Sequence, residues 1–454
     1  MSKSSASKSS ASIISRARTH VATSVARLAT VASRATGRGA GGMIGGLLAD
    51  KIDPNVMHNL ANGRPAVLVT GTNGKSTTTR MLAGALRSEY SVATNEGGDN
   101  MDAGIISALL AGRDAEVLAL EVDELHVPQV ADKINPQALV LLNLSRDQLD
   151  RVGEINKIER TLRSAIEAHP EMMVIANCDD VLITSVAYDA ANVVWVAAGG
   201  GWLGESTACP RTGGPIVRDG EHWYATKTLA DGSIFQRPRP DWTITDAGIT
   251  RNSAVGTEAE SVKAESDEAE SDTAHPLNLA LPGRANRGNA TQAIAAAVEA
   301  FGVGFSEAVA ATEQVDDVAG RYSTITRGEH EIRLLLAKNP AGWQEALSMV
   351  DRDAAGLVIA VNGQVADGED LSWLWDVTFE DFGEQSVKAA GERGTDLAVR
   401  LVYADISHEL IKDPLKAIDA CPPGRIEVLA NYTAFRDLKK ALERGEATAN
   451  SKEA

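Results

Sequence analysis

The sequence predicts an α/β protein with two units, each built on a mainly parallel sheet between helices. Three observations predict it. Short continuous apolar runs alternate with helix-like segments, as in parallel sheets covered on both faces. A glycine-bearing turn joins the first of these runs to a helix. The chain of 454 residues is too long for one core, so two or three domains are expected.

The first unit begins with the apolar run 66–70. Further candidate strands lie at 117–120, 138–142, 172–175 and 193–196. Polar residues follow or end three of them: Glu121, Asn143 and Asn177. Ligands of open α/β sheets bind beyond the carboxyl ends of the strands, so this edge is the predicted binding edge.

The pattern breaks between residues 201 and 280, where an acidic low-complexity stretch covers 257–274. That stretch cannot bury enough apolar surface to become ordered, which favours a solvated loop. An alanine-rich helix follows at 289–301, and a second unit has candidate strands at 332–336, 357–361 and 426–429. We therefore divide the chain into a basic segment (1–40), a central domain (41–315) with a ribbon-like insert (201–280), a C-terminal domain (316–445) and a tail (446–454).

The composition narrows the class of protein. A formal charge of −18 disfavours nonspecific nucleic-acid binding. The three cysteines are far apart and form no paired metal spacing, which suits a reducing compartment such as the cytoplasm. No apolar stretch reaches membrane-spanning length.

The N-terminus departs from this acidic average. Residues 1–40 contain no acidic residue and seven basic ones: Lys3, Lys8, Arg16, Arg18, Arg27, Arg34 and Arg38. A Ser/Ala/Arg-rich beginning can also imitate an organelle transit peptide. Two interpretations stay open, a solvated tail and a weak amphipathic helix that contacts an anionic membrane surface.

The turn after the first strand predicts a phosphate-binding loop. It is a shortened P-loop, because only two residues separate its glycines, and it comprises Gly71, Thr72, Asn73, Gly74, Lys75, Ser76 and Thr77. Backbone N–H groups and the helix N-terminus attract phosphate. Lys75 adds a mobile cation, and the Ser76 hydroxyl can bind Mg²⁺.

Further motifs show a family resemblance. They are Glu-Val-Asp-Glu at 121–124, the segments 143–151 and 281–289, and Gly320-Arg321. With the P-loop, they resemble the Mur ligase superfamily of ATP-dependent amide-forming enzymes. Three C-terminal segments resemble the MurT family within it: Ala-Lys-Asn-Pro-Ala-Gly at 337–342, the Asp-Leu-Ser-Trp stretch within 366–376, and Asn431-Tyr432-Thr433. The likeness runs from about residue 37 to residue 442, interrupted by the acidic stretch.

The resemblance implies a Mur-ligase-type P-loop central domain, a smaller Rossmann-like C-terminal domain and a reaction. ATP phosphorylates the α-carboxylate of D-glutamate in the lipid II stem peptide, and ammonia converts the acyl phosphate to D-isoglutamine for peptidoglycan. The implied partner is a GatD-type glutamine amidotransferase, in a heterodimer at the cytoplasmic membrane face. The implied cofactors are ATP and Mg²⁺.

The resemblance also assigns residues. Lys75 would hold the β/γ-phosphates, and Ser76 and Glu121 would hold Mg²⁺, with Asp123 and Glu124 as alternatives for the ion. Two further positions match nucleotide contacts of the family, although each could be a local cap or a surface charge: Asn286 and Arg321.

Asp370 matches the acid that such chains lend to the Cys–His pair of the glutaminase subunit, where a carboxylate orients the histidine. The alternative for Asp370 is a helix cap, since Ser372 follows, and Asp376 is the fallback. Nothing in the chain resembles a glutaminase, and Cys178 is interpreted as a buried small residue.

Two departures from the family pattern matter. Many relatives carry a four-cysteine zinc ribbon, but only Cys209 remains here, so we expect the ribbon without zinc, held by Trp223, Tyr224 and Phe235. Many relatives also use a histidine and a carbamylated lysine near a second Mg²⁺. Gln148 stands at the histidine position, which favours one Mg²⁺ over two. Lys157 is too uncertainly placed to take the lysine role.

Two other functions remain open. One is a different Mur-fold ligase, of the muramyl-peptide or folylpolyglutamate type, against which only the Asp370–Trp373 segment argues. The other is a nucleotide-binding scaffold that has lost catalysis.

Overall fold

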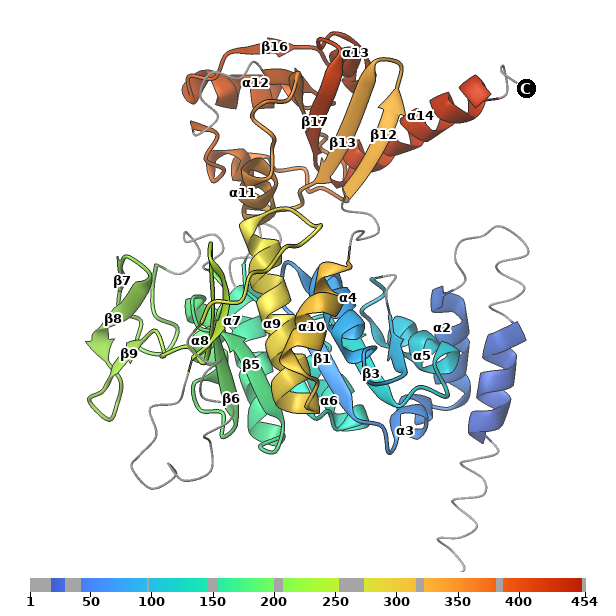
Figure 1. Ribbon diagram of the computed structural model, residues 1–454, viewed down its shortest axis with the longest axis vertical. Coiled ribbons are helices and arrows are strands. Elements are labelled where there is room, and N and C mark those ends of the chain that lie inside the picture. The colour runs from blue at the N-terminus through green and yellow to red at the C-terminus, as the bar shows by residue number, and fades with distance from the viewer. Residues whose placement is uncertain are drawn as a thin grey trace, which may run out of the picture.

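The computed structural model describes residues 18–28, 42–95, 98–145, 154–199, 207–252, 273–315, 322–380 and 387–450. Two sheet-based units are visible, with the C-terminal unit above the central one (Figure 1). Each has a mixed, mostly parallel sheet between layers of helices, which confirms the predicted α/β class.

The central unit is built on an eight-stranded sheet. Its strands in sheet order are β11 (Gly248–Arg251), β10 (Trp242–Thr245), β6 (Val193–Ala197), β5 (Met173–Asn177), β4 (Ala138–Leu141), β1 (Ala66–Thr70), β3 (Val117–Glu121) and β2 (Val92–Thr94). Neighbouring strands run parallel except β10 and β11. The β1 strand, which leads into the P-loop, therefore lies between β3 and β4, so the ends of both neighbours meet that loop.

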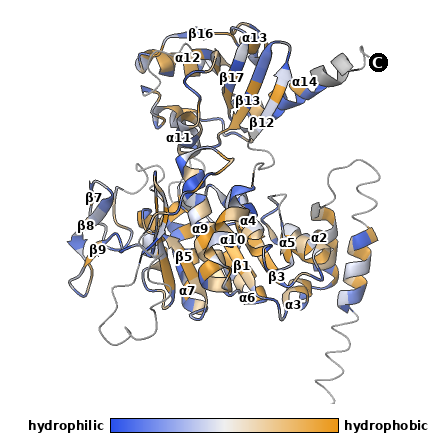
Figure 2. Cartoon of the chain, viewed as in Figure 1, coloured by the Kyte–Doolittle hydropathy of each residue, from blue (hydrophilic) through white to orange (hydrophobic). Residues whose placement is uncertain are grey.

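Both faces of this sheet are buried, which explains why its strands are continuously apolar (Figure 2). Leu68 points to one face, whereas its neighbours Val67 and Val69 point to the other. The first face carries α2 (Gly42–Ile52), α3 (Val56–Ala61), α5 (Asp102–Ala111), α6 (Val127–Ile134), α7 (Glu154–Ala168) and α8 (Val181–Ala187). The second face carries α4 (Lys75–Leu86), α9 (Arg284–Phe301) and α10 (Phe305–Glu313).

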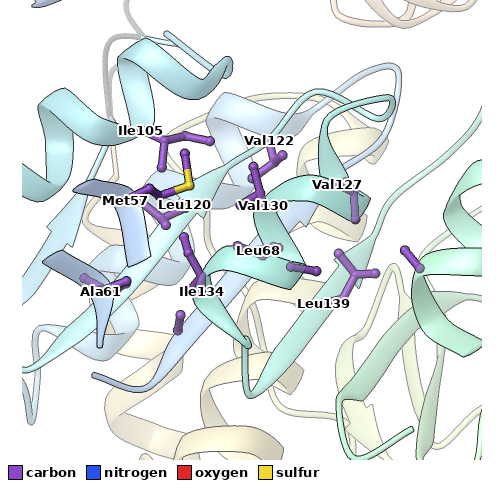
Figure 3. Close-up of a cluster of buried hydrophobic side chains, with 14 of the residues drawn as sticks. Met57, Ala61, Leu68, Ile105, Leu120, Val122, Val127, Val130, Ile134 and Leu139 are labelled. Atoms are coloured by element: carbon purple, nitrogen blue, oxygen red, sulfur yellow. The ribbon is translucent and has the colours of Figure 1, made fainter. Parts of the chain in front are cut away.

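Figure 3 shows part of the first core, where Leu68, Leu120 and Leu139 from three strands meet Met57, Ile105 and Val130 from the helices. Fully burying a side chain of this size contributes about 1.5–3 kcal/mol. This packing holds the strand ends, and the loops that follow them, in fixed relative positions.

The insert expected over 201–280 is too long, which corrects the sequence interpretation. β10 pairs with β6 and continues the main sheet, and β11 returns beside it as a hairpin. The only described strands that form a separate sheet in this region are β7 (Ile216–Asp219), β8 (His222–Thr228) and β9 (Ile234–Gln236). The Gly- and Pro-rich composition hid a short strand pair with a two-residue turn.

A small aromatic core supports the three-stranded sheet. Trp223 and Phe235 are buried with ring centroids 5.3 Å apart, as expected, and Phe235 also contacts Tyr188 of the neighbouring helix segment at 5.2 Å. Tyr224, the third residue expected to hold the sheet, is only half-buried and lies outside this cluster. Cys209 is buried within it.

The C-terminal unit has a six-stranded sheet. Its order is β12 (Tyr322–Arg327), β13 (His330–Leu336), β17 (Gly424–Ala430), β14 (Gly356–Ala360), β15 (Val387–Ala390) and β16 (His408–Leu410), with only β12 antiparallel. One face packs against α11 (Pro340–Ser348), the 3₁₀ turn η2 (Ser372–Trp375) and α12 (Gly394–Tyr403). The other packs against α13 (Pro414–Asp419) and α14 (Tyr432–Asn450).

The described part of the basic N-terminus, residues 18–28, is helical. The Arg18 Nε group donates to the carbonyl of Ile52 at 2.8 Å, which ties this helix to the end of α2. Among the helices described, none is both long and apolar enough to span a bilayer.

Candidate active site

The P-loop turn between β1 and α4 requires glycine at both of its glycine positions. Gly71 and Gly74 have φ angles of 140° and 86°, which other residues rarely adopt. A Cβ on Gly71 would lie 2.9 Å from Leu142 Cβ, and one on Gly74 would lie 2.7 Å from Asn289 Oδ1. The backbone can therefore curl tightly around a small anion.

Residues after β4 clamp this loop. The Asn73 backbone N–H donates to Asn143 Oδ1, and Asn143 Nδ2 donates back to the Asn73 carbonyl, each at 3.0 Å. The Thr72 hydroxyl and Ser145 backbone form a second reciprocal pair at 3.0 and 3.1 Å. Hydrogen bonds within the protein thus hold the loop in shape.

The first turn of α4 is a suitable phosphate site. Its N-cap is Gly74, which has no side-chain acceptor for the amides that follow. Those N–H groups and the positive end of the helix favour an anion. Lys75 stands at this end, with Nζ 2.6 Å from the Gly71 carbonyl and 3.4 Å from both Glu124 oxygens.

Glu121 ends β3 and is 3% exposed. Asn95 holds its backbone through two 2.8 Å hydrogen bonds, and Asn100 Nδ2 donates to Glu121 Oε1 at 3.1 Å. Ser76 lies on the first turn of α4, beside Gly98 of the loop that contains both asparagines.

The donors present suit Mg²⁺ only with help from a bound nucleotide. A carboxylate and a hydroxyl are oxygen ligands of the kind Mg²⁺ takes, and phosphate and water would complete the shell. Across the described ranges, no cluster of three His, Cys, Asp or Glu side chains could hold a metal ion. His222 is exposed and Cys209 is buried, and the absence of zinc stays a prediction.

The remaining residues considered for the nucleotide and for a second metal ion lie in different places. Asn286 is 1% exposed on the first turn of α9, and its Nδ2 donates to the Pro282 carbonyl at 2.6 Å, so it stabilises its own loop. Arg321 lies outside the described residues, as does Gln148. Lys157 is exposed on α7.

Sequence reasoning missed three asparagines around the loop. Asn143 was recognised only as a strand end, although it makes the reciprocal clamp. Asn289 of α9 packs against Gly74. Asn339 of the C-terminal unit donates from Nδ2 to Asn73 Oδ1 at 3.3 Å. All three lay in segments already singled out by motif, at 143–151, 281–289 and 337–342, which was the available signal.

Asp370 lies on the surface of the C-terminal unit. Its Oδ1 accepts a 2.8 Å hydrogen bond from the Ser372 backbone N–H, so the capping contact considered for it is present. This bond engages one carboxylate oxygen and orients the group at the start of η2. Asp376 ends the same 3₁₀ turn and is half-buried.

Cys178 is buried, as the sequence suggested. Burial and the neighbouring Asp179 raise the pKa of its thiol far above the ordinary value. A thiol that stays protonated is a poor nucleophile.

Comparisons with known proteins agree with this arrangement. A family model described as Mur ligase middle domain matches residues 69–199, and one described as MurT ligase C-terminal matches residues 336–435. The lipid II isoglutaminyl synthase (glutamine-hydrolyzing) subunit MurT of Streptococcus pneumoniae is 29% identical, covering 89% of this chain and 93% of the relative. That of Staphylococcus aureus strain N315 is 26% identical, covering 92% and 97%.

Solved structures share the fold at low sequence identity. A pseudomurein peptide ligase type C from Methanothermus fervidus superposes with a TM-score of 0.63 at 17% identity, covering 88% of this chain and 83% of that one. MurF from Acinetobacter baumannii gives 0.56 at 17% identity, covering 87% and 80%. By its two matched domains and its end-to-end relatives, this chain belongs to the Mur ligase superfamily and, within it, to the MurT family.

Proposed function

We propose that this chain is the ligase subunit of an ATP-dependent, glutamine-using enzyme that amidates the D-glutamate α-carboxylate of lipid II. The observation that carries the proposal is a preformed phosphate loop in a chain similar along about nine-tenths of its length to curated subunits of lipid II isoglutaminyl synthase. The product would be D-isoglutamine in the peptidoglycan precursor.

The chemistry follows from the poor reactivity of a carboxylate. One carboxylate oxygen attacks the γ-phosphorus of ATP, the bond to the β-phosphate oxygen breaks, and ADP leaves. Ammonia then attacks the carbonyl carbon of the acyl phosphate, loses a proton, and inorganic phosphate leaves. No enzyme nucleophile is needed, so positioning and neutralisation of charge account for most of the rate.

The P-loop residues would carry this positioning. The loop 71–77 cradles the phosphates, and Lys75 moves from its contact with Gly71 and Glu124 to the β- and γ-phosphates. Ser76 and Glu121 would hold Mg²⁺, which supplies positive charge to the phosphates when bound. Asn286 and Arg321 are proposed to contact the rest of the nucleotide.

A partner subunit would supply the ammonia, and the C-terminal unit has a surface suited to one. Four apolar side chains on or beside α12 are 48–72% exposed: Trp375, Val399, Val402 and Tyr403. We call this the α12 patch. Trp375 and Tyr403 make an edge-to-face contact at 5.3 Å, and buried Arg400 bonds the carbonyls of Leu374 and Val377, which holds η2 rigid.

Large exposed aromatic residues on a rigid support are typical of protein interfaces. The α12 patch includes Trp375, five residues after Asp370. A GatD-type glutamine amidotransferase seated there would receive the Asp370 carboxylate beside its Cys–His pair. In that position Asp370 would orient the histidine and stabilise its protonated form.

The N-terminal helices support peripheral contact with the membrane that contains lipid II. Val21, Val25 and Leu28 lie one helical turn apart and are 36–72% exposed, with Arg18 and Arg27 on the same helix. On α2, Met43, Ile44 and Leu47 are 42–50% exposed. Apolar stripes with basic residues favour an anionic lipid surface. Sedimentation with phosphatidylglycerol vesicles, but not with phosphatidylcholine vesicles, is the expected result.

The test of the proposal combines the chain and its amidotransferase partner with lipid II, glutamine, ATP and Mg²⁺. We expect ADP formation that requires both acceptor and nitrogen source, together with amidated lipid II. Amide formation with an amino acid instead of ammonia would support the other Mur-fold ligases. Nucleotide binding without ADP formation would support the non-catalytic scaffold.

A further inference from the structure

Helix α11 lies where the C-terminal unit meets the central unit, close to α9 (Figure 1). Its N-cap, Asn339, is 2% exposed and uses both ends of its side-chain amide. Oδ1 accepts from the Gly342 N–H at 2.8 Å, which caps the helix, and Nδ2 donates to Asn73 Oδ1 of the P-loop at 3.3 Å. The start of α11 is therefore attached directly to the predicted phosphate site.

The other end of α11 rests on the second predicted nucleotide segment. Met349, the C-cap, packs against Gly283, the N-cap of α9, where a Cβ would lie 2.7 Å from Met349 Cε. Gly283 has a φ of 100°, so this close approach depends on glycine. Arg333 donates to the Met349 carbonyl and holds this end to β13. Both ends of α11 thus contact segments predicted to bind ATP.

The middle of α11 packs against η2, the turn that follows Asp370. Trp343 is fully buried and stacks on Trp373, with ring centroids 5.4 Å apart and planes 26° apart. Trp373 belongs to η2, and the first residue of η2, Ser372, donates its N–H to Asp370 Oδ1. An unbroken series of contacts therefore runs from Asn73 through Asn339, Trp343 and Trp373 to the Asp370 turn.

Building on the proposed function, we propose that α11 couples nucleotide occupancy of the P-loop to the orientation of Asp370, with Asn339 as the positioning residue. Phosphates in the cradle contact the loop that contains Asn73, and a shift of that side chain moves the cap of a short, rigid helix. Packed aromatic rings transmit such shifts as changes between discrete arrangements. Glutamine would then be hydrolysed fastest when ATP is in place, which limits the loss of ammonia.

Contact alone does not establish coupling, because coupling is a free energy between two sites. The measured quantity is the ratio of glutaminase rates of the assembled complex with and without a non-hydrolysable ATP analogue. We expect a ratio of about five, because that factor corresponds to the net free energy of one neutral hydrogen bond. The ratio should fall to about one in Asn339→Ser, because serine keeps the N-cap but is too short to reach Asn73.

Asn252→Ser is the matched control. Asn252 Nδ2 also makes two hydrogen bonds, to Pro240 and Thr243, but it lies in the central unit away from α11. Its nucleotide response should equal that of the unchanged complex. Trp373→Phe is a second test at the other end of the series, and it should reduce the ratio while the complex still forms. In Asn339→Ser the glutaminase rate without nucleotide should be unchanged, whereas a general loss of folding would lower it.

Two results would overturn the coupling. One is an equal ratio in the unchanged complex and in Asn339→Ser, and the other is a ratio of one in the unchanged complex. Amidation with ammonium chloride as the nitrogen source separates this failure from failure of the proposed function. If ammonium supports ATP-dependent amidation, only the coupling proposal is contradicted. If neither nitrogen source supports amidation, the proposed function is contradicted, and so is the coupling that rests on it.

Discussion

The Lys75 ammonium lies 3.4 Å from the carboxylate of Glu124, and both side chains are about nine-tenths buried. The lysine predicted to bind phosphate is therefore already engaged by an acid that follows β3. A nucleotide must draw Lys75 away from this carboxylate, unless Glu124 itself joins the site through Mg²⁺.

Glu124→Gln separates these two roles. If Glu124 only competes for Lys75, removing its charge should tighten ADP binding by about fivefold or more, because a pair this buried interacts more strongly than the ~1 kcal/mol upper range of an exposed pair. Isothermal titration calorimetry with and without Mg²⁺ measures this, with Glu116→Gln, an exposed acid away from the loop, as control. Weaker binding only in the presence of Mg²⁺ would instead make Glu124 a metal ligand.

Gly74→Ala should prevent nucleotide binding. Alanine at a φ of 86° costs about 1–2 kcal/mol, and its Cβ would also meet Asn289 Oδ1 at 2.7 Å. Gly63→Ala is the matched control, because Gly63 has a similar φ of 79° with no atom within 4 Å of the added Cβ. Both variants should lose similar thermal stability, because both place alanine at a positive φ. Only Gly74→Ala should lose ATP binding. Normal ATP binding by Gly74→Ala would show that the loop does not need its tight turn.

Asp370→Asn should lower glutamine hydrolysis by the complex on the order of a hundredfold or more, since an amide cannot stabilise a protonated histidine. Asparagine can still accept the Ser372 N–H bond, so η2 and the complex should persist in a pull-down. Asp376→Asn is the control within the same turn. Full glutaminase activity in Asp370→Asn, together with loss in Asp376→Asn, would move the role to Asp376.

The cysteines should resist alkylation in the folded protein. All three are buried, and burial raises the pKa of the Cys178 and Cys421 thiols, so little thiolate forms at neutral pH. Iodoacetamide followed by mass spectrometry should modify none of them until denaturant is added. Rapid modification of Cys178 in the native protein would contradict its interpretation as a structural residue.

The sequence predicted those features that are determined by residues close to one another along the chain. Continuous apolar runs revealed the central strands because both faces of each are buried, and the P-loop was recognised because its residues are consecutive. β10 and β11 were missed because their place in the main sheet depends on pairing with β6 rather than on their composition.

The same reason explains what was missed in the site. The Asn73–Asn143 clamp spans 70 residues, and the contact from Asn339 to Asn73 spans 266. Motifs marked the segments that contain Asn143 and Asn339, but no local pattern shows that either side chain bonds Asn73. Pairing of β4 with β1 brings Asn143 to the loop, and packing of the two units brings Asn339 there.

The most direct test of the acyl-phosphate step traces the oxygen atoms of the α-carboxylate. Lipid II with ¹⁸O at both oxygens of the D-glutamate α-carboxylate is incubated with the complex, glutamine, ATP and Mg²⁺. If the carboxylate is phosphorylated before ammonia attacks, each inorganic phosphate released should contain one ¹⁸O atom, detected by mass spectrometry. Amidated product accompanied by unlabelled phosphate would contradict the acyl-phosphate account.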